Sequence, residues 1–514
     1  MTKFIGIDLG TTFSALAMLN PIGRPEIVPN SEGERITPSA VYFDDEENAV
    51  RVGVEAINSR QLNPDRAVRF VKRHMGADWK KIVGQHTWTP QEISSLILKK
   101  LKQDAEIEHG AITDVVISVP AHFDETRRKA TMDAGTLAGL NVIGIVNEPV
   151  AAALFYATSH DVNGRVLVYD LGGGTFDVSI LDINGRNMKI LCSQGDHALG
   201  GIDFDHKLIE IFQDEYKKQY HADLILTDQD MAKHEDEAED VKKTLSRRTS
   251  AKKILYGASG SARIEITREQ FEKAIEPLIA RTEMLIDVAL DEAKSKTKNI
   301  TKILLVGGST RIPMVHQRLT AKFGFAPEVA VNVDECVALG AAIHAGLTQL
   351  REKPEIVPAG IAGGLRDVKL KDVCNHSYGT ICAPIDEQTG RHVIRNTILL
   401  NKNTPLPCTT TQTFYTMADN QTELQVSITQ GEDEDPDFVN KIASEIFELP
   451  PDRPAGRPIR VEYSYDANQR MHCTFEDEES GRKLEVEFCA GKDGQLSKQN
   501  VGHRAEQMEK LNVK

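Results

Sequence analysis

Two stretches of the chain combine an acid, glycines and hydroxyl residues in the same order. The first is FIGIDLGTTFSAL at residues 4–16, and the second is VLVYDLGGGTFDVSIL at residues 166–181. In each, an apolar run leads to an aspartate (Asp8 or Asp170), then to a turn of glycine and threonine, then to a second apolar run. This order predicts the same β-hairpin twice in one chain.

The turns of both predicted hairpins suit a phosphate chain. Backbone N–H groups approach a phosphate closely only where the side chains are small. Carboxylates at the strand ends, here Asp8 and Asp170, can hold Mg²⁺ through its water shell. Two such hairpins that face each other would hold one nucleotide between two similar lobes. The small residues of the two turns are Gly10, Thr11, Thr12, Gly172, Gly173, Gly174 and Thr175.

A plain β-turn with glycines for tightness explains one such hairpin, but it explains two matching copies poorly. Neither turn has the GxxxxGKS/T spacing of a Walker loop or a GxGxxG after one strand. A third glycine turn, LLVGGSTRIP, could pack against a base and a ribose, although turns of this type are also common scaffolding. Its candidate residues are Gly307, Gly308, Ser309 and Arg311.

Composition and charge exclude several classes of protein. The net charge of −15 argues against a general nucleic-acid or membrane-surface binder. Seven cysteines without a CxxC pair indicate neither a disulfide framework nor a zinc site. The first residues form a strand pattern broken by Asp8 and not a signal peptide, and no apolar stretch is long enough to span a membrane. We therefore expect a cytoplasmic protein.

The pattern of predicted secondary structure changes along the 514 residues of the chain, which are enough for two or three domains. Alternating strand and helix patterns predict an α/β architecture at first, and alternating strands with frequent turns later predict an all-β sandwich. The tail is polar and offers at most one short helix. The predicted segments are an α/β nucleotide-binding domain at 1–350, a linker at 351–372, a β-sandwich at 373–491 and a tail at 492–514.

Several of these stretches resemble the signature blocks of the seventy-kilodalton heat-shock (DnaK-type) chaperone family. Blocks such as IGIDLGTTFS, NEPVAAAL, VYDLGGGTFDVS and VNVDECVALGAA occur in the family's order and spacing, and FYTMADNQTELQVSITQGE resembles part of its peptide-binding sandwich. The resemblance covers nearly the whole chain, but the family's long helical lid has no counterpart. It implies an α/β actin-like (ribonuclease-H-like duplicated) ATPase domain of two lobes, followed by an all-β sandwich that binds peptides.

The resemblance also implies roles for individual residues. Lys72 would orient the γ-phosphate and the attacking water, although its residue type alone predicts an exposed helix lysine. Pro120 and Arg128 would relay the nucleotide state to the surface. The implied catalytic residues are Lys72, Glu148, Asp170, Thr175 and Asp177, with Asp8 and Asp170 as the metal residues. The implied nucleotide contacts are Gly10, Thr11, Thr12, Phe13, Gly172, Gly173, Gly174, Glu239, Lys242, Lys243, Ser246, Gly307, Gly308, Ser309, Arg311 and Asp334.

In the sandwich, the resemblance implies four peptide-binding residues, although ordinary strand packing also explains them. They are Thr380, Cys382, Met417 and Leu424.

The chain departs from the family pattern in several places, including a shorter stretch from Trp79 to Trp88. Lys369 and Lys371 interrupt the hydrophobic linker, so we expect its docking to be costlier and the coupling of the domains weaker. Gly144 stands where a family arginine helps to receive the J-domain co-chaperone, so we expect poor use of that partner. Lys243 stands where some members have an arginine that stacks on the base, which predicts a lower nucleotide affinity.

The function that these observations predict is an ATP-dependent chaperone. It would hydrolyse ATP with Mg²⁺ and bind extended segments of unfolded proteins, with a nucleotide exchange factor as a further partner and no nucleic acid or membrane. Without a lid, peptide binding should be weak and short-lived. Two alternatives stay open: a regulatory or assembly ATPase whose sandwich docks a specific protein, and a small-molecule kinase of the same superfamily, which would need a sugar or acid pocket.

Overall fold

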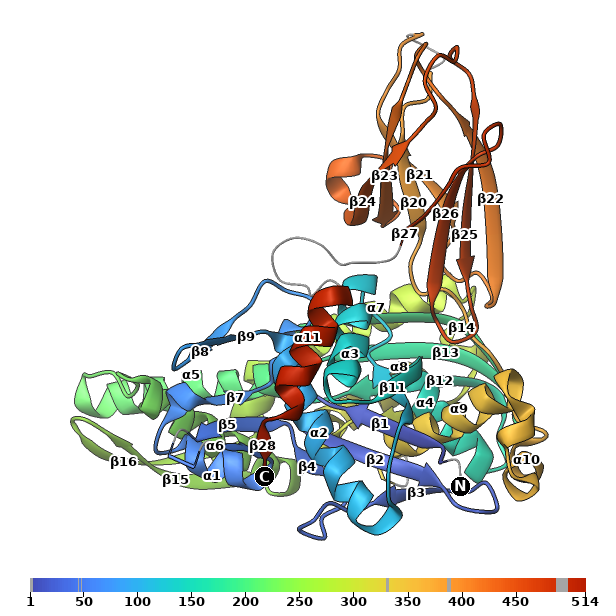
Figure 1. Ribbon diagram of the computed structural model, residues 1–514. Helices are drawn as coiled ribbons and strands as arrows, with labels where there is room; N and C mark the ends of the chain where they lie inside the picture. The colour runs from blue at the N-terminus through green and yellow to red at the C-terminus, as the bar shows by residue number, and fades with distance from the viewer. Residues whose placement is uncertain (1–2, 45, 48, 330–331, 386–389, 487–497) are drawn as a thin grey trace.

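The computed structural model describes residues 3–44, 46–47, 49–329, 332–385, 390–486 and 498–514. A broad α/β body carries a narrow all-β domain on one side (Figure 1). The predicted architecture, an α/β domain followed by a β-sandwich, is confirmed. The expected boundary between sandwich and tail, at 491/492, lies outside the described residues.

Two six-stranded sheets form the body, one in each of two lobes. The sheet of lobe I contains β1 (Ile5–Leu9), β2 (Phe13–Leu19), β3 (Pro25–Val28), β4 (Thr37–Pro38), β10 (Asp114–Val119) and β11 (Asn141–Asn147). The sheet of lobe II contains β12 (Asn163–Leu171), β13 (Phe176–Asn184), β14 (Asn187–Asp196), β17 (Ile300–Val306), β18 (Glu328–Val329) and β19 (Lys369–Lys371).

The two sheets share one topology. Strands β1 and β2 form an antiparallel hairpin, β10 adds parallel to β1, and β11 adds parallel to β10. Strands β12 and β13 form the equivalent hairpin, β17 adds parallel to β12, and β18 adds parallel to β17. The duplicated hairpins of the sequence are therefore the central strands of a duplicated sheet.

Two helices join the lobes in a shared apolar core. Helices α4 (Glu148–Ser159) and α9 (Cys336–Glu352) contribute buried side chains to one cluster with strands of both sheets. Gly340 of α9 lies so close to α4 that a Cβ atom would sit 1.8 Å from the carbonyl oxygen of Ala151. Only glycine permits this approach, so the helix pair fixes the distance between the lobes.

The remaining helices of the body cover the outer faces. Lobe I carries α1 (Val54–Arg60), α2 (Pro90–His109) and α3 (Glu125–Leu137). Lobe II carries α5 (Gly201–Tyr220), α6 (Asp228–Arg247), α7 (Arg268–Glu292) and α8 (Pro313–Phe323). Smaller strands complete the lobes: β5 (Ala40–Asp44), β6 (Ala49–Val52), β7 (Ala67–Arg69), β8 (Lys81–Val83), β9 (His86–Trp88), β15 (Ser250–Gly257) and β16 (Gly260–Thr267).

The all-β domain is a sandwich of two four-stranded sheets. One sheet contains β20 (Tyr378–Cys382), β21 (Arg395–Leu400), β23 (Glu423–Gln430) and β24 (Asn440–Glu448). The other contains β22 (Cys408–Tyr415), β25 (Pro458–Tyr465), β26 (Met471–Asp477) and β27 (Lys483–Val486). Buried and half-buried residues alternate along β25, which is the pattern of a strand with one face in the core.

The predicted linker is ordered against the body and contacts both lobes. It includes α10 (Ala359–Leu365) and β19, which pairs in parallel with the edge strand β14. The expectation that Lys369 and Lys371 oppose docking is wrong, because side chains of a strand alternate between its two faces. Both lysines point to solvent, whereas Leu370 packs against the core of the body.

The tail also differs from its predicted character. Helix α11 (Lys498–Glu509) and strand β28 (Asn512–Val513) pack on lobe I, and β28 pairs in parallel with β6. The segment is polar on average, but its apolar residues Val501, Met508 and Val513 are buried. Val501 and Met508 are seven residues apart, so they share one face of a helix. No helix in the described part of the chain is both long and apolar enough to cross a membrane.

Candidate functional site: a cleft between two facing hairpins

The two hairpin turns meet at the centre of the body. A Cβ atom on Gly173 would sit 2.3 Å from Oγ1 of Thr12, and one on Gly174 would sit 2.6 Å from Cγ2 of Thr11. Because the turns approach this closely, only glycines fit at these two positions. The turns line a cavity of about 80 Å³ together with Gly10, Phe13, Gly172, Thr175, Gly307, Gly308 and Asp334.

Three buried carboxylates, one partly buried carboxylate (Asp8) and one buried lysine surround this cavity or lie beside it. Lys72, on a short 3₁₀ turn at Val71–His74, is only 4% exposed, and its Nζ atom donates to Oε1 of Glu148, the first residue of α4. Asp8 lies on β1, just before the turn of the first hairpin, and its carboxylate accepts a hydrogen bond of 2.7 Å from the hydroxyl of Ser118. The remaining two acids, Asp170 and Asp177, are directly paired across the β12–β13 hairpin.

Burial and mutual repulsion raise the pKa values of the carboxyl groups in this cluster, which contains more acids than cations. Burial, followed by the charge of Glu148, raises the pKa of Asp8 to about 6 and that of Asp177 to about 8. The same two causes raise the pKa of Asp170 well above its usual range. Lys72 is the one cation that opposes these shifts. A carboxylate set of this kind, with small turn residues beside it, fits a divalent cation bound to phosphate oxygens.

The third glycine turn closes one side of the cavity. Gly307 has φ of +80°, and a Cβ atom there would sit 2.4 Å from the carbonyl oxygen of Leu171. Ser309 donates to the carbonyl oxygen of Gly172 (2.8 Å), which joins this turn to the second hairpin. Arg311 pairs with Asp334 (2.6 Å) at the rim, so the turn residues predicted from the sequence lie together.

Four predicted adenosine contacts lie on α6, next to the cavity but not in its lining. Lys242 donates to Asp205 (2.6 Å) and to the carbonyl oxygen of Gly201 (3.0 Å), and Ser246 donates to the carbonyl oxygen of Lys242. Glu239 pairs with Lys243 (2.7 Å). Burial favours its neutral form, but Lys243 and the nearby arginine Arg69 outweigh burial and lower the pKa of Glu239 to about 2.

Ion pairs across the mouth of the cleft were not predicted from the sequence. Arg60 and Arg69 of lobe I pair with three acids of α6, and Arg73 of lobe I pairs with Asp203 of α5. The acidic run HEDEAED suggests a solvated helix face. The one signal for these ion pairs is the spacing of its acids at i, i+1 and i+4, which places them on one side of the helix where they can share a basic partner. The acids are Glu235, Asp236 and Glu239.

The loop after Pro120 connects the cleft to the sandwich. The backbone N–H of His122 donates to Oδ1 of Asp177 (3.2 Å). Next along the chain, the carbonyl oxygen of Phe123 contacts Nε2 of His376, a residue of the sandwich domain (3.2 Å). One short loop therefore touches a cleft carboxylate on one side and the sandwich on the other.

Arg128 lies at the same junction and is 1% exposed. Its guanidinium donates to the carbonyl oxygen of Phe123 (3.0 Å), to Asn147 (2.7 Å) and to Gln469 of the sandwich (2.5 Å). Gln469 in turn donates to Asp372 at the end of the linker (2.5 Å). The guanidinium thus joins lobe I, the sandwich and the linker.

Gly144 lies beneath the sandwich. A Cβ atom at this position would meet Asn468 at 3.5 Å, an ordinary contact distance, and Arg470 donates to the carbonyl oxygen of Val142 (2.8 Å). The turn that carries Asn468 and Arg470 therefore covers the β11 position at which the family arginine was expected.

The sandwich contains an open cavity of about 610 Å³ between its sheets. All four predicted peptide-binding residues line it: Thr380, Cys382, Met417 and Leu424. The hydroxyl of Thr380 donates to the carbonyl oxygen of Ser427 (2.8 Å), whereas Met417 is half exposed at the rim. The apolar floor includes residues that the sequence analysis did not single out, namely Phe414, Val426, Ile459 and Phe475.

Comparison with known proteins agrees with this geometry. The model of the family described as Hsp70 protein matches residues 4–88 and 80–514. The chain is 39% identical over 492 residues to "Chaperone protein DnaK" of Thermotoga neapolitana and to that of Thermotoga petrophila. Each alignment covers 93% of this chain and 79% of the relative. The facing hairpins, the cleft and the sandwich are thus those of a nucleotide-binding protein, and the chain belongs to the Hsp70 family of ATP-dependent chaperones.

Proposed function

We propose that this chain hydrolyses ATP, with Mg²⁺, in the cleft between its hairpins, binds extended peptides in the sandwich, and couples the rate of hydrolysis to peptide binding. The observation that carries the proposal is the physical continuity from Asp177 in the cleft, through the loop that follows Pro120, to the sandwich. A regulatory ATPase without peptide binding would not need the open apolar cavity between the sheets.

In the cleft, the chain supplies positioning and charge. The backbone N–H groups of Gly10, Thr11, Thr12 and Gly172 to Thr175 would hold the phosphates, and Asp8 and Asp170 would hold the hydrated Mg²⁺, which neutralises phosphate charge. Lys72, buried among carboxylates, would stabilise the charge that develops on the transferring phosphoryl group, while Glu148 and Asp177 would orient the attacking water. Phosphoryl transfer to water requires little beyond this.

In the sandwich, an extended peptide would gain main-chain hydrogen bonds and insert apolar side chains into the cavity. Leu424 and Met417 would contact those side chains, and the buried ring of Phe475 with the partly buried ring of Phe414 would exclude water from the cavity floor. The clients proposed are therefore unfolded segments with apolar residues. A nucleotide exchange factor is a further proposed partner, and a J-domain partner should act weakly because a sandwich turn covers Gly144.

The experiment that tests this function is a refolding assay with a chemically denatured reporter enzyme. Reporter activity should recover further with the chain, Mg²⁺ and ATP than with the chain and ADP. The matched variant is Leu424→Asp, which places a charge in the cavity and should remove the gain without affecting the basal rate of ATP turnover. Phosphorylation of glucose or glycerol would instead support the kinase alternative, and equal recovery with both nucleotides would contradict the proposal.

A further inference from the structure

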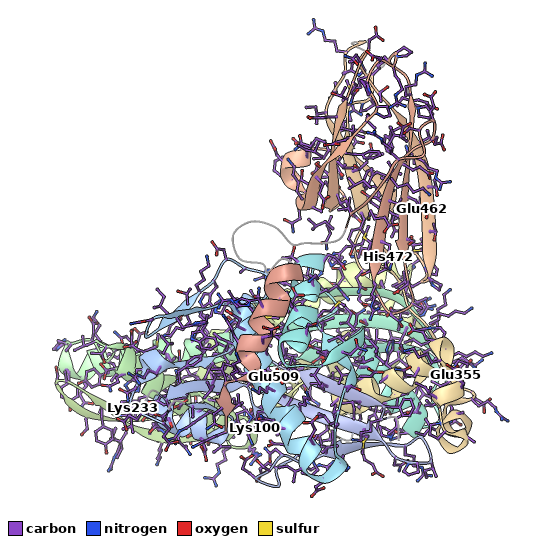
Figure 2. All side chains as sticks on the ribbon, viewed as in Figure 1. Lys100, Lys233, Glu355, Glu462, His472 and Glu509 are labelled. Atoms are coloured by element: carbon purple, nitrogen blue, oxygen red, sulfur yellow. The ribbon has the colours of Figure 1, made fainter. Side chains whose placement is uncertain are left out.

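Residues 498–514 return from the sandwich to lobe I and bury apolar side chains there. Val501 and Met508 of α11, with Val513 of β28, belong to the same buried cluster as the core residues of α2 and α3. Figures 1 and 2 show α11 lying along the body, with Glu509 at its end near α2 and well apart from Glu462 of the sandwich. This segment, which we call the clasp, is thus part of the lobe I core.

Lys99 of α2 fixes the end of α11. Its Nζ atom lies 2.9 Å from each of three carbonyl oxygens, those of Met508, Glu509 and Leu511. The last carbonyls of a helix lack partners within the helix, and an ammonium group has three donors to offer them. A single lysine therefore donates to three carbonyl oxygens of the turn between α11 and β28.

Strand β28 adds a further strand to lobe I. Val513 is paired with Val50 of β6, the backbone N–H of Lys514 donates to the carbonyl oxygen of Val50 (2.8 Å), and the N–H of Val52 donates to that of Lys514 (3.0 Å). These main-chain bonds extend the sheet that contains β5, β6 and β7. The clasp is held by a core contact, a capped helix end and a strand pairing.

The chain segments that precede and follow the sandwich are therefore both bound to the body. Before it, β19 is paired with β14 of lobe II; after it, the clasp is bound to lobe I. Twelve peptide steps join Val486 of β27 to Lys498, a span of at most roughly 40 Å even if fully extended. Helix α3 links the two systems, since it contacts α11 and also carries Arg128, which bonds to the sandwich.

We propose that the clasp holds the sandwich in its docked position on the body whichever nucleotide is bound. The elements that bind the clasp are α2, α3 and β6, and none of them lines the cavity between the hairpin turns. A change of nucleotide therefore does not reach the contacts of the clasp directly. By contrast, His376 of the sandwich contacts Phe123, and the neighbouring residue, His122, donates its backbone N–H to Asp177 in the cleft. Undocking is already followed by intramolecular re-docking because of the linker, and a second attachment point restricts the range of the undocked sandwich and raises its effective concentration further.

Small-angle scattering of the full chain, with saturating ADP and with a non-hydrolysable ATP analogue, tests the clasp. Met508→Asp places a charge in the buried face of α11, and Lys99→Ala removes the donor from three carbonyls while leaving the lobe I core intact. Lys102→Ala is the matched control, because this lysine of α2 donates to the carbonyl oxygen of Gly139 and not to the clasp. Thermal unfolding of each variant confirms that the lobes remain folded.

The wild type and Lys102→Ala should give the same compact profile with both nucleotides. With ADP, Met508→Asp should be larger by a few Å on a radius of gyration of roughly 24 Å, and Lys99→Ala should shift in the same direction. Expansion of the wild type with ADP, or compact profiles for both clasp variants, would overturn the proposal. Since scattering does not require hydrolysis, a clasped chain without ATPase activity would refute the proposed function alone.

Discussion

Lys72 is the residue whose environment most changes its interpretation. The sequence alone predicts an exposed lysine, but the side chain is buried and bonded to Glu148. Its charge opposes, without cancelling, the rise in the pKa of Asp8, Asp170 and Asp177. A buried lysine without acids beside it would be costly, so the cluster and the lysine require each other. This mutual dependence supports a role in stabilising phosphoryl charge.

Lys72→Ala should lower single-turnover ATP hydrolysis by at least about 100-fold, because preorganised charge acts mainly in the transition state. ATP affinity, measured by equilibrium binding of a fluorescent analogue, should stay within about tenfold. Lys207→Ala, which removes an exposed lysine paired with Glu210, is the control and should behave as wild type. Unchanged turnover in the Lys72 variant would remove this residue from the mechanism.

His122 is a residue whose protonation opposes docking. Its ring lies 5.4 Å from that of His376 across the boundary between body and sandwich. Burial, followed by the charges of Lys402 and His197, lowers the pKa of His122 to about 4, while Asp196 and Asp124 act weakly in the opposite direction. The folded state therefore excludes a proton that the unfolded chain binds below about pH 6.5.

The pKa of His122 is lower in the folded state than in the unfolded chain. At pH 7.5 the histidine is neutral in both states and does not affect the free energy of unfolding, whereas this free energy decreases as the pH falls from about 6.5 towards 4. His122→Gln should remove this loss, so the variant should gain about 1–2 kcal/mol relative to wild type at pH 5. Thermal unfolding at several pH values gives the difference between the two proteins, which cancels the titrating groups that do not interact with His122. A difference that does not change between pH 7.5 and 5 would contradict the assignment.

At the scale of elements, the turn at 466–470 of the sandwich docks against β11. Asn468 fills the space above Gly144, and Arg470 bonds to the backbone of the same strand. A Cβ atom fits here at an ordinary distance, whereas a long side chain would have to displace the turn. The residue at 144 therefore determines how closely the sandwich approaches lobe I.

Gly144→Arg should lift this turn and destabilise the docked sandwich by roughly 1–3 kcal/mol, the usual cost of overpacking. Gly144→Ala is the matched control and should be nearly neutral. Hydrogen exchange of the amides in 466–470 is the measurement, with faster exchange expected only for the arginine variant. Equal protection in both variants would show that this turn does not depend on close contact with β11.

The elements were largely predictable, whereas their long-range contacts were not. Asp8, Asp170 and the glycine turns carry their signal within about ten residues, and alternation of strands and helices is equally local. The pair of Arg128 and Gln469 joins residues 341 positions apart, and no local pattern indicates it. The lysines of the linker illustrate the same limit, because their direction depends on which face of β19 meets lobe II.

At the scale of the whole molecule, the described residues leave the peptide cavity open. Tyr415 and Met417 are 64% and 51% exposed at its rim, and α11 packs on lobe I instead of covering the sandwich (Figure 1). Within the part of the chain that the structure describes, a bound peptide would contact the groove and no element packed over it. Weak retention was also expected from the sequence.

Release of a labelled heptapeptide, followed by stopped-flow fluorescence, should be fast with ADP and should differ little with ATP, since affinity differences among related complexes lie mainly in the off-rate. Met417→Ala should accelerate release further, because it removes contacts at the rim of the cavity. Release over many minutes with ADP and much faster release with ATP would show that the groove is closed by a nucleotide-controlled element.

The most direct test of the account is steady-state ATP hydrolysis titrated with an unfolded model peptide. We expect Mg²⁺-dependent turnover that rises when peptide binds, because the loop after Pro120 contacts Asp177 in the cleft and His376 of the sandwich domain. Leu424→Asp should keep the basal rate and lose the rise, and Lys72→Ala should lose both. Turnover that is absent, or that saturating peptide leaves unchanged in the wild type, would contradict the central claim.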